Sequence, residues 1–321
     1  MKLSCIEFCS GAGGQALGLE RAGFRHECLV ELDPDARATT KFNRPAWNHA
    51  EGEQVDLRHF DATKFRGVDL VAGGLPCPPF SIAGQQLGAH DDRDLFPEGI
   101  RVLKETRANA FLFENVKGLM SRKFDAYREE LIRTFTSLGY RVYATLVNAL
   151  DFGVCQSRQR LLIVGIRNGF DVKFRWPVPQ LQNSLTVGQT LLDLMAEHGW
   201  HGAAKWARTA NGPAPTIVGG SKKHGGADLG PSGARKAWLG LGVDGREVAN
   251  APPQSCFEGI PRLTLQMVAR LQSFPDDWQF CGGKTSIYRQ IGNAPPAPIS
   301  HAVGQSIANV LRGSTRLEKA A

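Results

Sequence analysis

Cys77 is the residue with the clearest chemical potential in this sequence, because it stands between Pro76 and Pro78 directly after the apolar run 68–75. A proline on each side fixes φ near about −65° and removes backbone donors, so the expected strand must end there and the thiol is held on a stiff corner. A thiol presented in this way can act as a nucleophile once it is deprotonated. The alternative is a buried structural cysteine in a proline turn, which is the commoner role of an isolated free thiol.

Groups with acid–base and electrostatic chemistry follow two other apolar segments. Glu114 ends the apolar run 110–113, where burial is expected to raise the pKa of its carboxyl group and make it a proton donor near neutral pH. Its alternative is a solvent-facing strand end. Arg158 and Arg160 are two residues apart at the entry of an expected strand, so their side chains should point the same way and could lower the pKa of a nearby thiol or hold a phosphate.

A glycine-rich turn follows the first expected strand, residues 3–10. The turn consists of Gly11, Ala12, Gly13 and Gly14. Glycines here let a ligand approach the backbone closely, and they leave the N-terminus of the following amphipathic helix open to a polar or anionic group. Many nucleotide-binding α/β proteins carry such a turn, so it does not identify the ligand by itself.

Acidic residues are expected at the ends of the next two strands. The second strand, 26–32, ends near Glu31, and a carboxylate at that place can accept hydrogen bonds from ribose hydroxyls. Asp33, which precedes a proline, is better explained as a helix N-cap. Asp61 closes a short third strand expected within 56–63.

The order of the remaining elements predicts an α/β fold. Helices and strands are expected to alternate at 95–107, 110–113, 124–138, 141–148 and 160–166. This alternation favours a mostly parallel sheet covered by helices. The polar, glycine-bearing loop 82–94 is long enough to act as a lid.

A change in composition near residue 175 predicts a second, smaller domain. Short glycine- and proline-rich segments replace the alternating pattern there. We therefore expect a first domain over 1–172, an irregular domain over 173–287, and a C-terminal segment, 288–321, that packs back on the first domain.

Charge favours a polyanionic partner. The net charge is +7 and the isoelectric point is about 9.1. Residues 200–240 contain six Lys or Arg, among them Lys222 and Lys223, against one acidic residue. The segment either neutralises a phosphate chain or is an ordinary solvated basic face.

Cysteine usage and hydropathy exclude other classes. The seven cysteines form no Cys-x-x-Cys pair, which argues against a disulfide framework and against structural zinc, so no metal is expected. No apolar run approaches the roughly 20 residues that span a bilayer, and the first residues lack the apolar core of a signal peptide. A cytoplasmic protein without membrane contact is expected.

Taken in order, these features resemble the cytosine-C5 DNA methyltransferases that use S-adenosylmethionine. The motifs are the glycine turn, Pro76-Cys77, Glu114-Asn115-Val116, Gln156-Ser157-Arg158-Gln159-Arg160 and Gly292-Asn293. Each motif alone is a weak signal, but the ordered set spans most of the chain and is specific. Two positions depart from the family pattern, since Cys9 stands where Phe is usual and Pro78 stands where Gln is usual.

The resemblance implies a Rossmann-like methyltransferase sheet with a smaller, irregular target-recognition domain. It also implies that Cys77 attacks C6 of a flipped-out cytosine and that Glu114 protonates N3 and orients the exocyclic amine. Arg158 would position the ring carbonyl, and Arg160 belongs to the same motif.

S-adenosyl-L-methionine is the implied cofactor. Gly11 and Gly13 would allow close approach. Glu31 would bind the ribose, Asp61 the adenine amine, and Asn293 would be brought back by the terminal segment. The expected cofactor-binding set also contains Cys9, Ala12, Gly14, Leu32, Ala62 and Pro76.

Double-stranded DNA is the implied partner. The pair Thr216-Ile217 resembles the Thr-hydrophobic pair of the family's target-recognition segment. The expected DNA-binding residues are Ser81, Gln156, Thr216, Ile217, Lys222 and Lys223. The expected protein is a monomeric, nucleoid-associated methyltransferase of the restriction-modification type, with a cognate restriction endonuclease as a separately acting partner.

Three alternatives remain open from the sequence. A methyltransferase acting on cytosine in tRNA would carry the same motifs. A nicotinamide-dependent oxidoreductase would account for the glycine turn and Glu31, but it would form no covalent adduct at Cys77. A catalytically silent DNA-binding relative would not need the thiol, the acid and the arginines together.

Overall fold

The computed structural model describes residues 2–76, 94–179, 185–219 and 226–318, and it divides the chain into two compact units. The first unit comprises Met1–Val147, Gln159–Val178 and Ile299–Ala321. The second comprises Asn148–Arg158 and Pro179–Pro298. Residues 148–158 and 288–298 therefore join the second unit, in contrast to the boundaries expected from the sequence.

Local contacts explain both additions to the second unit, and residues 173–178 lie in the first unit instead of the expected second domain. Gln156 forms a β-bridge with Ala214, which draws the segment 148–158 away from the sheet. The helix that ends at Asn293 packs on the helix α8 (Leu265–Leu271) of the second unit.

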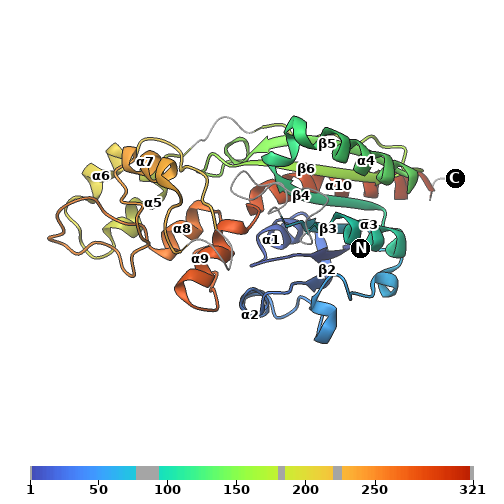
Figure 1. Ribbon diagram of the computed structural model, residues 1–321, viewed down its shortest axis with the longest axis horizontal. Helices are drawn as coiled ribbons and strands as arrows, with labels where there is room; N and C mark the ends of the chain where they lie inside the picture. Colours follow the sequence, from blue (N-terminus) through green and yellow to red (C-terminus); the bar gives the residue numbers. More distant parts are fainter. Residues whose placement is uncertain (1, 77–93, 180–184, 220–225, 319–321) are drawn as a thin grey trace. The chain divides into compact units, whose positions relative to one another are not determined.

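A six-stranded sheet in the order β2-β1-β3-β4-β6-β5 forms the first unit (Figure 1). The strands are β1 (Leu3–Phe8), β2 (Phe24–Val30), β3 (Leu70–Gly74), β4 (Ala110–Val116), β5 (Tyr140–Asn148) and β6 (Gln159–Arg167). β1 is parallel to β2 and β3, and β3 is parallel to β4, whereas β6 is antiparallel to β4. The expected mostly parallel sheet is confirmed.

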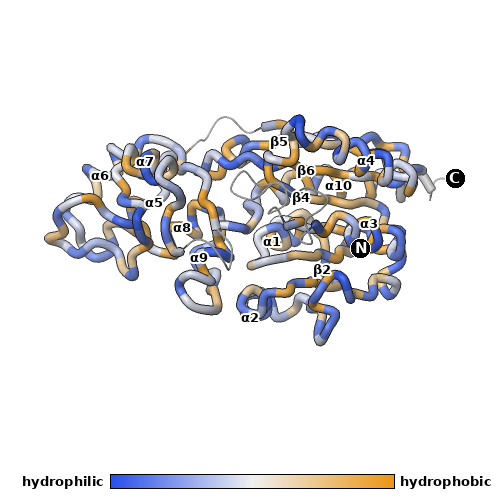
Figure 2. The backbone as a smooth tube through the Cα atoms, viewed as in Figure 1, coloured by the Kyte–Doolittle hydropathy of each residue, from blue (hydrophilic) through white to orange (hydrophobic). Residues whose placement is uncertain are grey.

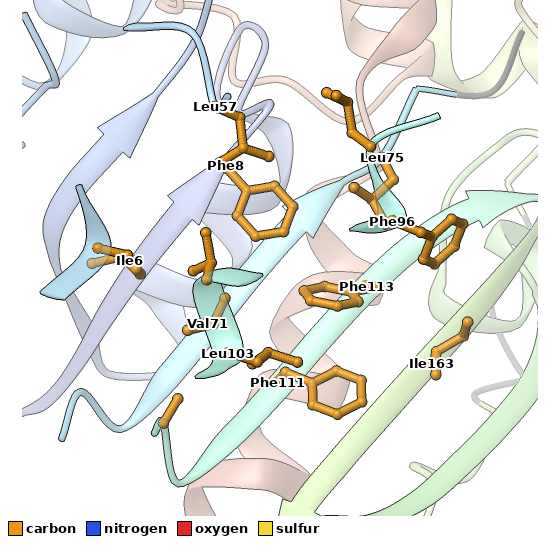
Figure 3. Close-up of a cluster of buried hydrophobic side chains, with 14 of the residues drawn as sticks. Ile6, Phe8, Leu57, Val71, Leu75, Phe96, Leu103, Phe111, Phe113 and Ile163 are labelled. Atoms are coloured by element: carbon orange, nitrogen blue, oxygen red, sulfur yellow. The ribbon is translucent and has the colours of Figure 1, made fainter. Parts of the chain in front are cut away.

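Helices cover both faces of this sheet. They are α1 (Gly14–Arg21), α2 (Pro34–Asn43), α3 (Phe96–Thr106), α4 (Asp125–Ser137) and α10 (Ala297–Glu318). Strand alternation in β1 sends Ile6 and Phe8 into the core cluster that includes residues of α3 and α4 (Figure 3). Glu7 points to the other face, where it lies near the first turn of α1. Apolar residues accordingly follow the strands (Figure 2).

Two glycines make room for aromatic rings on adjacent strands. A Cβ atom on Gly73 would lie 2.2 Å from the Phe8 ring, and one on Gly165 would lie 1.9 Å from the Phe111 ring. Each glycine is the register partner of its phenylalanine. The core is therefore closely packed around these two rings.

The prediction of a short strand within 56–63 is wrong. Two 3₁₀ helices, η1 (Gly52–Val55) and η2 (Ala62–Phe65), flank an irregular segment instead. The Asp61 carboxylate caps η2 by accepting from the Thr63 backbone N–H at 3.1 Å and from its hydroxyl at 2.5 Å. Such local side-chain bonds compete with strand pairing.

The second unit contains five α-helices joined by irregular segments in the part that the structure describes. Its helices are α5 (Val187–Ala196), α6 (Ala203–Thr209), α7 (Ser232–Gly240), α8 (Leu265–Leu271) and α9 (Lys284–Asn293). Trp206, Trp238 and Met267 are buried in it, so the segment has more core than its glycine-rich composition predicts. Gly188 allows α5 to approach α6, because a Cβ there would lie 2.0 Å from the Ala207 carbonyl oxygen.

Among the described residues, no helix combines the length and the apolarity that crossing a membrane requires.

Candidate active site

The candidate site lies at the carboxyl ends of the parallel strands in the first unit. Gly74 of β3 is paired with Glu114 of β4, and the backbone N–H of Leu75 donates to the Glu114 carbonyl at 3.1 Å. This pairing holds the half-buried Pro76 near the strand edge, directly before Cys77. In open α/β sheets, ligands bind at this edge.

Glu114 and Arg160 form an ion pair at this edge. The Arg160 Nε atom lies 2.7 Å from Glu114 Oε1, and both side chains are largely buried. Arg160 is opposite Val116 in the antiparallel β4–β6 pair, so it reaches Glu114 diagonally on the same face. This neighbouring cation was not included in the sequence argument from burial alone. The proton-donor role of Glu114 remains a prediction.

Cys77, Ser81 and residues 82–93 of the expected loop 82–94 lie outside the described residues. Four of the other thiols are poor candidates for a nucleophile, because burial raises their pKa and holds them in the neutral form. These are the thiols of Cys5, Cys9, Cys28 and Cys155.

Glu31 connects the glycine turn to the end of β2. Its Oε2 atom accepts from the Gly11 backbone N–H at 2.7 Å, and its Oε1 atom accepts from the Asp33 backbone N–H at 2.8 Å. Burial raises the pKa of the Glu31 carboxyl, while these two hydrogen bonds and Arg37 oppose the rise. A half-buried carboxylate beside a glycine turn can accept hydrogen bonds from a ribose diol.

The glycine turn leaves room for a ligand. Gly11 and Gly13 have φ values of 54° and 86°, which favour glycine, and a Cβ on Gly11 would have no atom within 4 Å. Cys9 also has a positive φ, 52°. Ala12 is fully buried, and Gly14 is the first residue of α1.

Asp61 exposes a carboxylate, whereas Leu32 exposes an apolar side chain. The hydrogen bonds from Thr63 lower the pKa of the partly exposed Asp61 carboxyl and keep it an acceptor. Ala62 is buried and donates its backbone N–H to Glu105 Oε2 at 3.2 Å. Leu32 leaves 59% of its surface exposed, an apolar face on which a purine ring could pack.

Arg158 lies in the second unit and does not share the environment of Arg160. Its side chain is fully buried and donates to the carbonyls of Ile217 at 2.7 Å, Gly292 at 2.8 Å and Ala294 at 3.2 Å. The expectation that both arginines point the same way is wrong, because β6 begins only at Gln159. Strand alternation therefore does not extend back to Arg158.

Gln156 is also buried and occupied within the second unit. Its amide donates to the Leu271 carbonyl at 3.2 Å and to Gln272 Oε1 at 2.8 Å, and its oxygen accepts from the Ile217 N–H at 3.1 Å. The expected DNA contact of Gln156 therefore finds no support. A fully buried amide cannot reach a nucleic acid at the surface.

The remaining residues expected in the site differ in how far they are buried. Thr216 is half-buried and donates its hydroxyl to the Ser157 carbonyl at 2.6 Å, whereas Ile217 is buried at 1% exposure. Asn293 is exposed at the end of α9, where its Oδ1 atom would lie 2.6 Å from a Cβ on Gly219. Lys222 and Lys223 lie outside the described residues.

Sequence reasoning missed Arg37. Its Nη1 atom donates to the carbonyls of Glu31 and Leu32, at 2.8 and 2.9 Å. Its place on α2, four residues after the Asp33 cap, is the only signal that could have indicated this contact.

The fold is that of an α/β protein whose candidate active site, with the Glu114–Arg160 pair, lies at the carboxyl edge of its sheet. A family model for C-5 cytosine-specific DNA methylases matches residues 3–309. The chain therefore belongs to the C-5 cytosine-specific DNA methylase family, and it is a DNA (cytosine-5-)-methyltransferase.

Individual relatives agree with this membership. The chain is 50% identical to the Type II methyltransferase M.NaeI of Lentzea aerocolonigenes, over 95% of this chain and 74% of that protein. It is 47% identical to the Type II methyltransferase M.NgoMIV of Neisseria gonorrhoeae, over 97% of this chain and 99% of that protein.

A mutant of Spodoptera frugiperda DNMT2 has the same fold, with a TM-score of 0.66 and 16% identity over 95% of this chain and 99% of that chain. The sheet is therefore the Rossmann-like methyltransferase sheet. The oxidoreductase alternative is not supported.

Proposed function

We propose that this methyltransferase acts on cytosine within a specific sequence of duplex DNA, as the modification enzyme of a Type II restriction-modification system. The methyl donor is S-adenosylmethionine, and the reaction passes through a covalent bond between Cys77 and C6 of the base. The observation that carries the proposal is the pairing of Gly74 with Glu114, because it brings the segment before Cys77 to the edge that holds the Glu114–Arg160 pair.

The first unit fits the proposed donor. The carboxylate of Glu31 is held beside Gly11, and the space next to Gly11 is open. Glu31 would bind the ribose hydroxyls, Leu32 would pack against the purine ring, and Asp61 would accept from its amine. When bound, the donor supplies an electrophilic methyl group on its sulfonium. The proposed set in the first unit is completed by Cys9, Ala12, Gly13, Gly14, Ala62 and Pro76, while the expected role of Asn293, a residue of the second unit, remains a prediction.

The residues at the strand edge would carry the covalent step. Cytosine C5 is a poor nucleophile, and addition of the Cys77 thiolate to C6 raises the electron density at C5. Glu114 would give its carboxyl proton to N3 as the thiolate adds, and Arg160, whose Nε atom lies 2.7 Å from Glu114 Oε1, would stabilise the carboxylate that is left. After methylation, loss of the C5 proton and departure of the thiolate restore the aromatic ring.

The second unit would contact the DNA. A base inside a duplex cannot reach the thiol, so it must be flipped out at a cost of a few kcal/mol. Ser81 and the loop 82–94 are proposed to close over the base, while Thr216, Lys222 and Lys223 contact the DNA. Arg158 and Ile217 act through the architecture of this unit, since both are buried. We further propose a nucleoid-associated monomer, with any cognate endonuclease acting separately.

Trapping with a mechanism-based substrate tests the covalent step. Duplex DNA containing 5-fluorocytosine, mixed with the protein and S-adenosylmethionine, is expected to form an adduct that survives denaturing electrophoresis. Cys77→Ser should form none, because the hydroxyl is a far weaker nucleophile. Cys256→Ser is the matched control, since Cys256 is an exposed thiol of the second unit, and it should form the adduct normally.

An adduct with Cys77→Ser, or none with the unaltered protein on DNA that it methylates, would overturn the covalent mechanism. Methyl incorporation into duplex DNA and into tRNA separates the proposed substrate from the tRNA alternative. Incorporation into tRNA alone would overturn the DNA proposal.

A further inference from the structure

Glu31 lies in the turn directly after β2, and one side chain of the following helix, α2, forms hydrogen bonds with the backbone of this turn. Arg37 Nη1 donates to the Glu31 carbonyl at 2.8 Å and to the Leu32 carbonyl at 2.9 Å. Both carbonyls follow the last residue of β2, where the sheet no longer supplies donors. Backbone carbonyls in such a place need another partner, and a guanidinium is a strong one.

The Glu31 carboxylate depends on the path of this turn. Its Oε2 atom is bound to the Gly11 N–H at 2.7 Å and its Oε1 atom to the Asp33 N–H at 2.8 Å. Each carboxylate oxygen can accept a second hydrogen bond, so one position on each remains for a hydroxyl donor. A rotation of the peptide planes after Glu31 would move these remaining positions relative to the glycine turn.

We propose that Arg37 is a positioning residue for the methyl donor, because its two hydrogen bonds to the Glu31 and Leu32 carbonyls fix the turn from which Glu31 binds the ribose. The inference rests on the proposed use of Glu31 as the ribose ligand. Arg37 itself does not touch the donor. Its effect is therefore on donor affinity and not on the rate of methyl transfer once the donor is bound.

Donor affinity of three single variants tests this role. Arg37→Met should raise the dissociation constant for S-adenosylmethionine about 3- to 10-fold, the range expected for losing hydrogen bonds from a charged donor. The kcat at saturating donor and DNA should change by less than about twofold. Arg37→Lys retains the cation and should recover part of the loss.

Lys41→Met is the matched control. Lys41 lies on the same helix, and its ammonium is 3.6 Å from the exposed Glu51 carboxylate. This change removes a cation of similar length without touching the turn, so donor affinity should not change.

A double-mutant cycle separates positioning from a general structural effect. In a Glu31→Gln background, Arg37→Met should weaken donor binding by less than about twofold, because the two residues act through one contact. An unchanged dissociation constant in Arg37→Met alone, or an equal loss in both backgrounds, would overturn the inference. An unchanged constant in Glu31→Gln alone would instead overturn the proposed donor site.

Discussion

Glu31 makes a prediction at the scale of one residue. Burial raises the pKa of its carboxyl above the ordinary value of 4.5. The ionised form accepts hydrogen bonds from ribose hydroxyls, whereas the protonated form loses part of this capacity. Donor affinity should therefore be highest above the raised pKa and should fall as the pH drops through it. This fall should occur at a higher pH than it would for a glutamate with an ordinary pKa.

The measurement is the dissociation constant for S-adenosylmethionine as a function of pH. Glu31→Gln should bind more weakly at neutral pH and should lack the acid limb. Glu129→Gln, which removes an exposed carboxylate of α4, should keep it. An acid limb that survives in Glu31→Gln would show that another group titrates.

Arg158 makes a prediction at the scale of elements, because it joins three segments of the second unit. Its guanidinium holds the carbonyls of Ile217, Gly292 and Ala294. Arg158→Met would leave buried carbonyls without these donors, at about 1–3 kcal/mol for each unsatisfied group. A clear fall in Tm is expected, and Arg158→Lys should not restore stability, because an ammonium lacks the planar fork.

Thermal unfolding measures this effect, with Arg208→Met as the control, since Arg208 is an exposed arginine of α6. If Arg158 instead contacts the base, as the family resemblance implied, Arg158→Met would unfold at the original temperature and lose only turnover.

At the scale of the whole molecule, net charge predicts the response to salt. The chain carries a net charge of +7. Binding that neutralises phosphates releases counterions, so the affinity for duplex DNA should fall about tenfold or more between roughly 50 and 200 mM salt. Filter binding with S-adenosylhomocysteine present measures this slope.

The affinity for S-adenosylmethionine serves as the internal control for that experiment and should change far less. A DNA affinity that does not depend on salt would contradict a phosphate-based contact.

Much of the fold could be predicted because strong local patterns coincide with it. The apolar runs that end near Gly74 and Glu114 became adjacent parallel strands, and the Asp33 cap begins α2 as expected. The prediction of a strand within 56–63 was wrong because Asp61 forms local hydrogen bonds with Thr63 instead of strand pairing. Four helices of the second unit, α5, α6, α7 and α9, were not predicted, because frequent glycines and prolines interrupt their short apolar faces.

The sequence by itself determined the family and the chemistry, because the thiol, the acid and the glycine turn occur in a specific order with recognisable neighbours. Only the tertiary structure decided which residues these side chains contact. The antiparallel register of β4 and β6 gives Arg160 to Glu114, and burial commits Arg158 and Gln156 to the interior of the second unit. Register and burial depend on residues far apart in the chain, so no local spacing could have separated two arginines only two positions apart.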